Sequence, residues 1–393
     1  MNRATTIVCL ALCTLASSAF AGPLDRAAAE RGREIADNAA AYLLSVQDDA
    51  TGGWSHNPSG PNLPAISGLV LKALLDHGGV TRDDPRVVRG VDYVLNYQQQ
   101  DGGIYDNLLP SYNTAISISM LARIGTPEAR EAMLAARGFL LGLQHHEGSL
   151  IAGPAASTVE QVGPDHPYYG GIGYGRNSRP DMSNLHFFLA ALEDSGFSAD
   201  EPAVQRALTF LARCQMEDTV NDMPYADGSK QGGFIYSTSP NRDGLGIGES
   251  KAGEIEETMD DGTNVSRLRA YGSVTYIGFK SYAYAQLSKD DPRVIAARRW
   301  IGEHYTLEEN PGAGTDGLYY FFMTFGRALD AWGEQQLELA DGSERDWAAD
   351  LIDRLGELQN EDGSFRSVDT RWMEDNPVLI TAYSLIALNE ALD

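Results

Sequence analysis

The stretch QQQDGGIYDN, residues 98–107, places three glutamines, an acid, two glycines and an aromatic residue directly after a helical pattern. Related phrases return at 45–55, 142–150 and 357–367, and a looser one spans 213–237. A phrase that returns along a chain indicates repeated supersecondary units. We therefore interpret it as the boundary between two elements that alternate through the whole sequence.

The segments that precede the phrase have the pattern of amphipathic helices. In 84–98, for example, Val91, Val94 and Leu95 recur at spacings of three and four, which places them on one helix face. Several of these segments open with an acid or threonine followed by proline, a typical helix start. The expected helices lie within 26–47, 84–98, 126–144, 200–215, 291–305 and 344–359.

The segments that follow the phrase are apolar or small almost all round, which is typical of helices buried on most sides. They span 63–78, 112–125, 180–196, 271–287, 317–333 and 376–392. Four of them end at a glycine that we expect to be a left-handed C-cap. These glycines are Gly78, Gly125, Gly196 and Gly333.

This alternation predicts an all-α fold, because short turns make successive helices antiparallel. Six such hairpins close most simply into a single α6/α6 toroid, with the buried helices as an inner ring and the amphipathic helices outside. An open superhelical array is the competing arrangement. The terminal units are no more polar than the middle ones, which favours closure, since open arrays need polar caps.

The recurring phrase then acts as a brace at the corner between an outer and an inner helix. Paired glycines such as Gly52 and Gly53 permit the positive φ that reverses the chain. The glutamine amide is expected to bond exposed backbone groups of helix ends. The aromatic residue that follows is expected to cover the seam between units. These aromatic residues are Trp54, Tyr105, Phe234 and Phe365.

The phrases FLLGLQHHEGSL (139–150), YVLNYQQQDGGIY (93–105) and LGELQNEDGSF (355–365) resemble the Gln–Trp repeats of the terpenoid cyclase and protein prenyltransferase superfamily, which includes the squalene cyclases. The resemblance covers roughly residues 25–392 and implies an α/α toroid with a central cavity for an isoprenoid-like ligand. The chain lacks the Asp-x-Asp-Asp run of the cyclases and the Asp-x-Cys step of the zinc-dependent transferases. The resemblance therefore implies the scaffold without the family's known catalytic groups.

Residues 1–21 have the pattern of a signal peptide, with Ile7–Ala16 as the apolar run and Ala19-Phe20-Ala21 as the cleavage site. The run is too short for a permanent transmembrane helix, although a membrane anchor is the alternative. We expect an exported protein, periplasmic or extracellular, whose toroid domain spans 22–393. Cleavage would leave Cys214 as the one remaining cysteine, so the mature chain would form no intrachain disulfide.

The chain carries 30 Lys plus Arg against 55 Asp plus Glu, a net charge of −25. Such an acidic surface repels phosphate backbones and anionic headgroups, so we expect neither nucleic-acid binding nor stable membrane insertion. One thiol among scattered histidines predicts no zinc site, and the acidic stretch 249–261 lacks the regular spacing of a calcium loop. We expect no cofactor, and a small molecule or an oligosaccharide as the partner. The oligomeric state is left open.

Two long loops, 148–180 and 216–271, lead to inner helices, and long ordered loops are often functional. From the first we select Tyr174, Arg179 and Asn184 as ligand-binding candidates and Asp181 as a catalytic candidate. An Asp at a helix start is also a common N-cap, which is the structural alternative for Asp181.

The second loop leads to Tyr271 and then to Tyr276, Lys280 and Tyr284, which are four apart and share one helix face. Phenols assist proton transfer, and a lysine among them would have a lowered pKa. Tyr276 and Lys280 are therefore catalytic candidates, and Tyr271 and Tyr284 are ligand-binding candidates. A satisfied, buried Lys–Tyr network is the alternative.

Tyr319 and Tyr320 are expected to add aromatic lining to the cavity.

Three functions fit this pattern of candidate residues. The first is an enzyme or binder of isoprenoid-like apolar ligands, as the resemblance implies. The second is a carbohydrate-active enzyme of the lyase type. The third is a non-catalytic binding scaffold, which predicts a filled axis. An apolar aromatic cavity would favour the first, and an open groove with Arg, Lys and Tyr the second.

Overall fold

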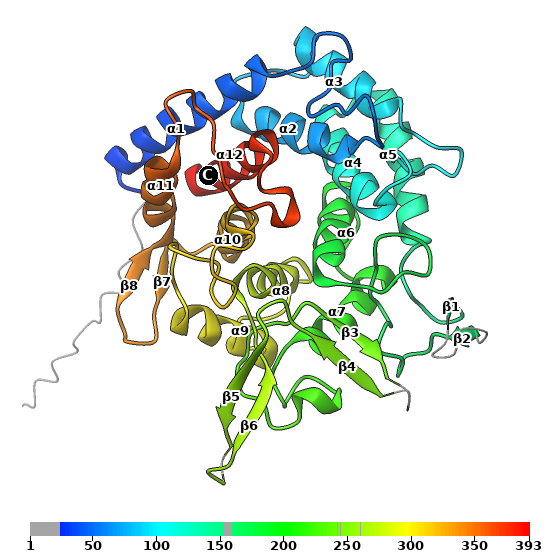
Figure 1. The fold of residues 1–393 in the computed structure, drawn as a ribbon, viewed down its shortest axis with the longest axis vertical. Helices are drawn as coiled ribbons and strands as arrows, with labels where there is room; N and C mark the ends of the chain where they lie inside the picture. The colour runs from blue at the N-terminus through cyan, green and yellow to red at the C-terminus, as the bar shows by residue number, and fades with distance from the viewer. Residues whose placement is uncertain (1–23, 153–158, 242, 244, 260) are drawn as a thin grey trace, which may run out of the picture.

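The computed structural model describes residues 24–152, 159–241, 243, 245–259 and 261–393. The expected signal peptide, 1–21, lies outside these ranges. The described chain forms twelve α-helices, which alternate between the periphery and the centre of a ring (Figure 1). The outer helices are α1 (Arg26–Ser45), α3 (Pro85–Leu95), α5 (Pro127–Leu141), α7 (Pro202–Cys214), α9 (Pro292–Glu303) and α11 (Trp347–Leu358).

The inner helices pack side by side around one axis, and the ring is closed. They are α2 (Pro64–His77), α4 (Pro110–Ile124), α6 (Met182–Asp194), α8 (Gly272–Tyr284), α10 (Leu318–Trp332) and α12 (Pro377–Leu392). Each inner helix contacts the next, and α12 contacts α2 and α1, so the last hairpin packs against the first. The predicted α6/α6 toroid is confirmed, and the open array is not formed.

The helix ends follow local sequence. Asp84 and Asp291 each precede a proline and accept a hydrogen bond from a backbone N–H of the first turn, as expected of N-caps. The four predicted glycines, Gly78, Gly125, Gly196 and Gly333, all have positive φ, between 65° and 81°. Gly196 directly follows Ser195, the residue at the C-cap of α6.

The corner brace is confirmed at four of the six corners. Each glutamine at the end of an outer helix directs its Nε2 at two carbonyls, one from a glycine in its own turn and one from the next outer helix. The sets are Gln47 with Gly52 and Arg86, Gln144 with Gly170 and Ala203, Gln215 with Gly232 and Arg293, and Gln359 with Gly363 and Ile35. Both amide N–H groups are thereby used, one within the unit and one between units.

The corner glycines approach the neighbouring helix too closely for a side chain. A Cβ on Gly363 (φ 82°) would lie 2.3 Å from the carbonyl oxygen of Asn38 in α1, and a Cβ on Gly170 (φ 81°) would lie 1.8 Å from that of Arg206 in α7. In the third unit the brace uses Gly170 rather than Gly148 of the quoted phrase, because the long loop is inserted between glutamine and corner.

At four corners a seam residue is buried, and its backbone N–H donates to a hydroxyl of the next inner helix. Trp54, Phe234 and Phe365 confirm the prediction, with Ser67, Thr275 and Thr381 as acceptors. At the second corner Ile104, rather than Tyr105, occupies the buried position and donates to Thr114. Tyr105 still covers the seam, because it stacks on Phe139 of α5, the next outer helix, at the surface.

The described chain contains four short antiparallel hairpins that the sequence pattern did not predict, three in the long loops and one between α10 and α11. They are β1 (Leu150–Ala152) with β2 (Val159–Gln161), β3 (Ser237–Pro240) with β4 (Gly246–Glu249), β5 (Glu254–Thr258) with β6 (Asn264–Leu268), and β7 (Gln336–Glu338) with β8 (Glu344–Asp346). The last pair shortens the segment predicted as an outer helix over 344–359, which begins only at Trp347. The hairpins lie at the periphery of the ring (Figure 1), and Leu337 of β7 packs into the core.

Charged side chains pair across the inner helices at their C-terminal ends. Lys280 of α8 contacts Glu193 of α6 at 3.2 Å, and Arg327 of α10 contacts Glu390 of α12 at 3.4 Å. Arg123 of α4 likewise pairs with Asp76 of α2 at 2.7 Å. Within the described ranges, none of the helices combines the length and the apolar character that a bilayer crossing needs.

Candidate functional site

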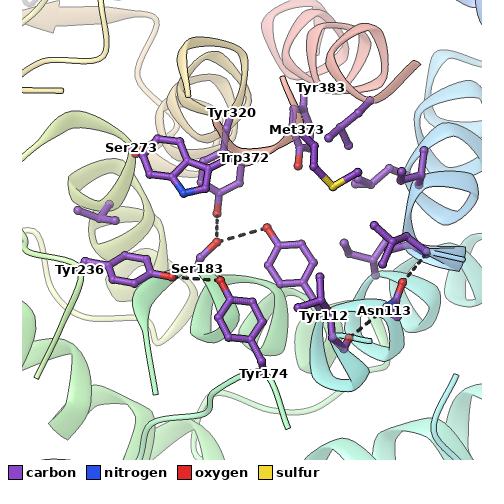
Figure 2. A pocket seen from close by; sticks show the side chains of 18 of the residues that line it. Tyr112, Asn113, Tyr174, Ser183, Tyr236, Ser273, Tyr320, Trp372, Met373 and Tyr383 are labelled. Atoms are coloured by element: carbon purple, nitrogen blue, oxygen red, sulfur yellow. Dashed lines mark hydrogen bonds between the residues drawn. The ribbon is translucent and has the colours of Figure 1, made fainter. Parts of the chain in front are cut away.

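A cavity of about 180 Å³ lies at the N-terminal ends of the inner helices. Every inner helix or the loop leading to it contributes to the wall, as Figure 2 shows from close by. The lining residues are Leu63, Ala65, Ile66, Leu69, Leu109, Tyr112, Asn113, Ile116, Tyr174, Ser183, Tyr236, Tyr271, Ser273, Val274, Tyr320, Trp372, Met373, Leu379 and Tyr383. The predicted axial cavity at this end is therefore present.

The wall is apolar and aromatic. Aliphatic side chains come mainly from α2 and α4 with the residues before them, and six tyrosines come from α4, α10, α12 and the loops that lead to α6 and α8. None of the described residues that line the cavity is charged. A ligand in this cavity would therefore meet hydrocarbon, ring faces and neutral hydroxyl or amide groups.

The register of the inner helices decides which side chains reach the cavity. The third residue lines it in five of the six: Ile66, Tyr112, Val274, Tyr320 and Leu379. In α6 the second residue, Ser183, takes this place. The inner helices run antiparallel to the outer ones and start at the same level along the axis of the ring. Their first turns therefore form one layer of the wall.

Three hydroxyl groups meet in this layer. The Ser183 Oγ lies 3.3 Å from the hydroxyl oxygen of Tyr112 and 3.0 Å from that of Tyr320 (Figure 2). The hydroxyls of Tyr174 and Tyr236 form a separate pair at 3.2 Å. Burial raises the pKa of all four phenols above the ordinary value, so they are neutral and able to donate at physiological pH.

A buried carboxyl group lies directly behind the Tyr174–Tyr236 pair. Asp181 is the N-cap of α6, and it accepts hydrogen bonds from the backbone N–H and the side-chain amide of Asn184 at 2.9 and 2.8 Å. Burial raises the pKa of Asp181 from 3.8 to about 6, although the bonds from Asn184 and the nearby Arg179 and Tyr236 oppose this. The capping alternative for Asp181 is confirmed.

The outer side of Tyr236 is covered by two cations. Arg179 lies over its ring at 5.8 Å and Lys251 at 4.7 Å. Both cations are ion-paired with Glu249 of β4. The charge at this rim is thus neutralised locally, and it is separated from the cavity by an aromatic ring.

The mouth of the cavity is covered by a short 3₁₀ segment before α12, Arg371–Met373, together with Glu374. Below we call residues 371–374 the strap. Trp372 and Met373 have φ of 55° and 65°, a region that non-glycine residues rarely occupy. Both are 41% exposed although they line the cavity. Glu374 binds the strap to the ring, because its carboxylate accepts the backbone N–H groups of Tyr319 and Tyr320 at 3.3 and 2.8 Å.

Glu374 thereby caps α10, whose own N-cap residue, Gly317, has no side chain to do so. Burial raises the pKa of Glu374 from 4.5 to about 7, against the opposing effect of the α10 N–H groups. At the other end of the strap, Arg371 pairs with Asp316 and lies over the Trp372 ring at 4.4 Å. The strap is therefore anchored on both sides of its two strained residues.

Three of the ten predicted site residues line the cavity, namely Tyr174, Tyr271 and Tyr320. Three others lie just outside the wall at the same end of the ring: Asp181 and its partner Asn184 behind it, and Arg179 at the rim.

The remaining four lie elsewhere. Lys280 is buried near the C-terminal end of α8 and is paired with Glu193, and burial lowers its pKa, as does the charge of Arg327. Tyr276 packs on the rings of Phe321 and Phe325. Tyr284 and Tyr319 donate to the carbonyls of Phe197 and Arg366. The structure therefore brings neither Lys280 nor Tyr276 to the cavity.

The sequence reasoning missed the other cavity phenols, Tyr112, Tyr236 and Tyr383, and also Ser183 and Trp372. Tyr112 and Ser183 would have emerged from an alignment of the first turns of the inner helices. Among the described residues, no group of three or more His, Cys, Asp or Glu is arranged to hold a metal ion.

No family model and no curated protein matches the sequence. Solved structures match in fold. A type II terpene cyclase, MstE, from Scytonema, in complex with geranylgeranyl dihydroxybenzoate, is 14% identical with a TM-score of 0.53, over 94% of this chain and 99% of that one. A cellobiose 2-epimerase from Spirochaeta thermophila is 12% identical with a TM-score of 0.54, over 93% and 96% of the two chains.

An unsaturated glucuronyl hydrolase from Streptococcus agalactiae is 14% identical with a TM-score of 0.54, over 95% of this chain and 94% of that one. These proteins differ in what they act on. What they share with this chain is the scaffold, so the chain is an α/α toroid, of the kind that serves both terpene cyclases and carbohydrate-active enzymes.

Proposed function

We propose that this protein binds a small, mostly apolar, isoprenoid-like ligand in its axial cavity. The observation that carries the proposal is the wall itself, which combines aliphatic side chains and ring faces with no charged group among the described residues. Pockets of this composition bind ligands chiefly through removal of apolar surface from water. The match in scaffold to a terpene cyclase is consistent with this ligand class.

The volume limits the size of the ligand. An apolar cavity of about 150 Å³ admits benzene, so about 180 Å³ suits roughly six to ten non-hydrogen atoms. That is one or two isoprene units. A longer chain would have to displace Trp372 and Met373, which cover the mouth. At roughly 0.4–0.8 kcal/mol per atom, a ligand of ten atoms would bind with a Kd between about 1 mM and 1 µM.

The carbohydrate alternative has one supporting feature, the exposed aromatic rings of Trp372 and Tyr174 beside arginines at the mouth. Arg371 is already paired with Asp316 and Arg179 with Glu249, and no described carboxylate lines the cavity. A saccharide would leave its hydroxyls facing hydrocarbon, which is costly. The scaffold alternative predicts a filled axis, whereas the axis contains a cavity.

We also propose that the functional role of Asp181 is to position Tyr236 and Tyr174, since it lies behind the wall rather than in it. We assign no role in the cavity to Lys280 or Tyr276. Export to the periplasm or the exterior remains part of the proposal and would be tested by N-terminal sequencing of the protein secreted by its native host, with Gly22 as the expected first residue.

The test is a binding assay on the mature protein, with Trp372 as the internal reporter, because it is the tryptophan that lines the cavity. Titration with 6-methylhept-5-en-2-one should change the fluorescence and the melting temperature. Titration with cellobiose should change neither. Ile66→Phe, which fills the cavity, should weaken binding at least tenfold. Ile295→Phe makes the same change at a 52% exposed position and should leave binding unchanged. Binding of cellobiose alone would refute the proposal.

A further inference from the structure

The three hydroxyls of Tyr112, Ser183 and Tyr320 have one hydrogen-bond donor more than the bonds between them require. They form two hydrogen bonds, Tyr112 to Ser183 and Ser183 to Tyr320, and each hydroxyl carries one proton. Two protons lie in these bonds, and within the described part of the chain neither bond takes up the third. The Tyr112 hydroxyl is also within hydrogen-bonding reach of the Tyr383 hydroxyl.

The position of the spare proton depends on the direction of the chain. It lies on Tyr320 if the bonds run from Tyr112, on Tyr112 if they run from Tyr320, and on Ser183 if both tyrosines donate to it. Tyr383, whose phenol lies beside that of Tyr112, would extend the chain by one proton and one bond and leave the same excess. In every case one donor faces the cavity, since all of these residues line it.

An unsatisfied donor in an apolar cavity costs free energy, which a ligand with an acceptor would recover. We infer that the ligand carries an oxygen acceptor, a carbonyl or hydroxyl group, that binds at the Tyr112–Ser183–Tyr320 hydroxyls, so that the protein selects oxygenated isoprenoids over hydrocarbons. This inference rests on the proposed function and specifies its substrate class. Burial keeps the phenols protonated, so the donor is present across the physiological pH range.

The opposite phenol pair provides a matched control. Tyr174 and Tyr236 also line the cavity and are hydrogen-bonded to each other. The Tyr236 hydroxyl is directed at the buried carboxyl of Asp181, where it favours the ionised form. In that pair one proton goes to the partner phenol and the other to the carboxylate, so no donor is left over for a ligand.

Two probes of equal shape separate recognition of oxygen from recognition of hydrocarbon. In 6-methylhept-5-en-2-one a carbonyl oxygen takes the place of the terminal methylene of 2,6-dimethylhepta-1,5-diene. The quantity measured is the ratio of the Kd of the hydrocarbon to that of the ketone. Solvation of the probes cancels when this ratio is compared between the wild type and a variant.

The test variant is the quadruple substitution Tyr112→Phe, Ser183→Ala, Tyr320→Phe and Tyr383→Phe, which leaves none of these hydroxyls as a donor, and the control is the double substitution Tyr174→Phe and Tyr236→Phe. We expect the ratio to fall about tenfold in the quadruple variant and to change less than twofold in the control. The Kd of the hydrocarbon should change less than threefold in both. If the quadruple variant fails to fold, the infrared carbonyl band of the ketone bound to the wild type should still lie at lower frequency than that of the ketone in hexane, as expected of a hydrogen-bonded carbonyl, and an unshifted band would overturn the inference.

The outcomes separate the two proposals. If both probes bind the wild type and the quadruple variant keeps the ratio, or if only the control loses it, the inference is overturned and the proposed function stands. If neither probe binds the wild type, the proposed function fails and the inference fails with it.

Discussion

Nε2 of Gln359 donates to the carbonyl oxygen of Ile35 at 2.8 Å, and this hydrogen bond joins the last outer helix to the first across 324 positions of sequence. The same side chain also donates to Gly363 in its own turn. Because Gln47, Gln144 and Gln215 make the corresponding pairs of bonds between consecutive units, the seam that closes the ring has the same construction as the seams within it.

Gln359→Ala should lower the free energy of unfolding by about 1–3 kcal/mol, because two backbone carbonyls lose their donor. Urea denaturation monitored by circular dichroism measures this loss. Gln99→Ala is the control, since that amide bonds only Tyr97 and Tyr105 within its own exposed turn and should cost less than about 0.5 kcal/mol. Equal losses in the two variants would show that the seam carries no special stability.

Asp181 should make the stability depend on pH. Its pKa is raised by burial from 3.8 to about 6 in the folded protein, so its contribution is complete below pH 4 and is lost as the pH rises to about 6. The loss amounts to about 3 kcal/mol. Asp181→Asn keeps a capping oxygen and removes the titration.

Unfolding in urea at pH 3 and pH 7 tests this. The difference in stability between the wild type and Asp181→Asn should shift by about 3 kcal/mol between the two pH values in favour of the variant at pH 7. Asp181→Ala removes the cap and should be less stable than Asp181→Asn at both. An identical pH dependence in the wild type and Asp181→Asn would contradict the buried, titrating carboxyl.

Glu374 should control the opening of the strap. Glu374→Ala removes the acceptor for the backbone N–H groups of Tyr319 and Tyr320, so these amides should exchange with solvent at least tenfold faster. The fluorescence of Trp372 should shift towards that of an exposed indole. Hydrogen exchange by mass spectrometry and emission spectra provide the two readouts. Glu361→Ala, at an exposed position in the preceding corner, should change neither.

Lys280 should contribute to stability without affecting the cavity. Lys280→Met removes the partner of Glu193 at the C-terminal end of the inner helices, away from the cavity wall. We expect the Kd for 6-methylhept-5-en-2-one to stay within twofold of the wild type. Fluorescence titration checks this against Ile66→Phe, in which binding is weakened. A loss of affinity in Lys280→Met as large as that in Ile66→Phe would show that Lys280 takes part in ligand binding.

The fold could be predicted because its causes are local and repeated. Amphipathic and fully apolar helices differ in composition, and the glutamine and glycines of each corner have one geometric role. The hairpins could not be predicted in this way. Their strands are only three to five residues long, too short for the alternation of apolar and polar residues to stand out in the sequence. The buried seam residue of the second corner is Ile104 and not Tyr105, because its position along the backbone decides which residue is buried. The aromatic character of the side chain does not decide it.

The site was predicted only in part, because depth along a buried helix has no periodic signal. Tyr276 and Lys280 are correctly placed on α8, where Tyr276 is buried and the Lys280 side chain is 12% exposed. Lys280 is the ninth residue of that helix, about 12 Å below its start, where charges from neighbouring helices meet. Tyr320, by contrast, is the third residue of α10 and reaches the cavity. The number of residues from the start of the helix therefore distinguishes Tyr320, which lines the cavity, from Lys280, which does not. The face of the helix on which a residue lies does not distinguish them.

The position of the cavity along the ring has a consequence for ligand exchange. Its lining comes from the first two turns of the inner helices, the loops before them and the strap, whereas the pairs Lys280–Glu193 and Arg327–Glu390 lie at the opposite, C-terminal end of the inner helices. A ligand of the proposed kind would therefore enter and leave beside the strap. Exchange would be sequential, because a bound molecule would have to leave before the next one could enter.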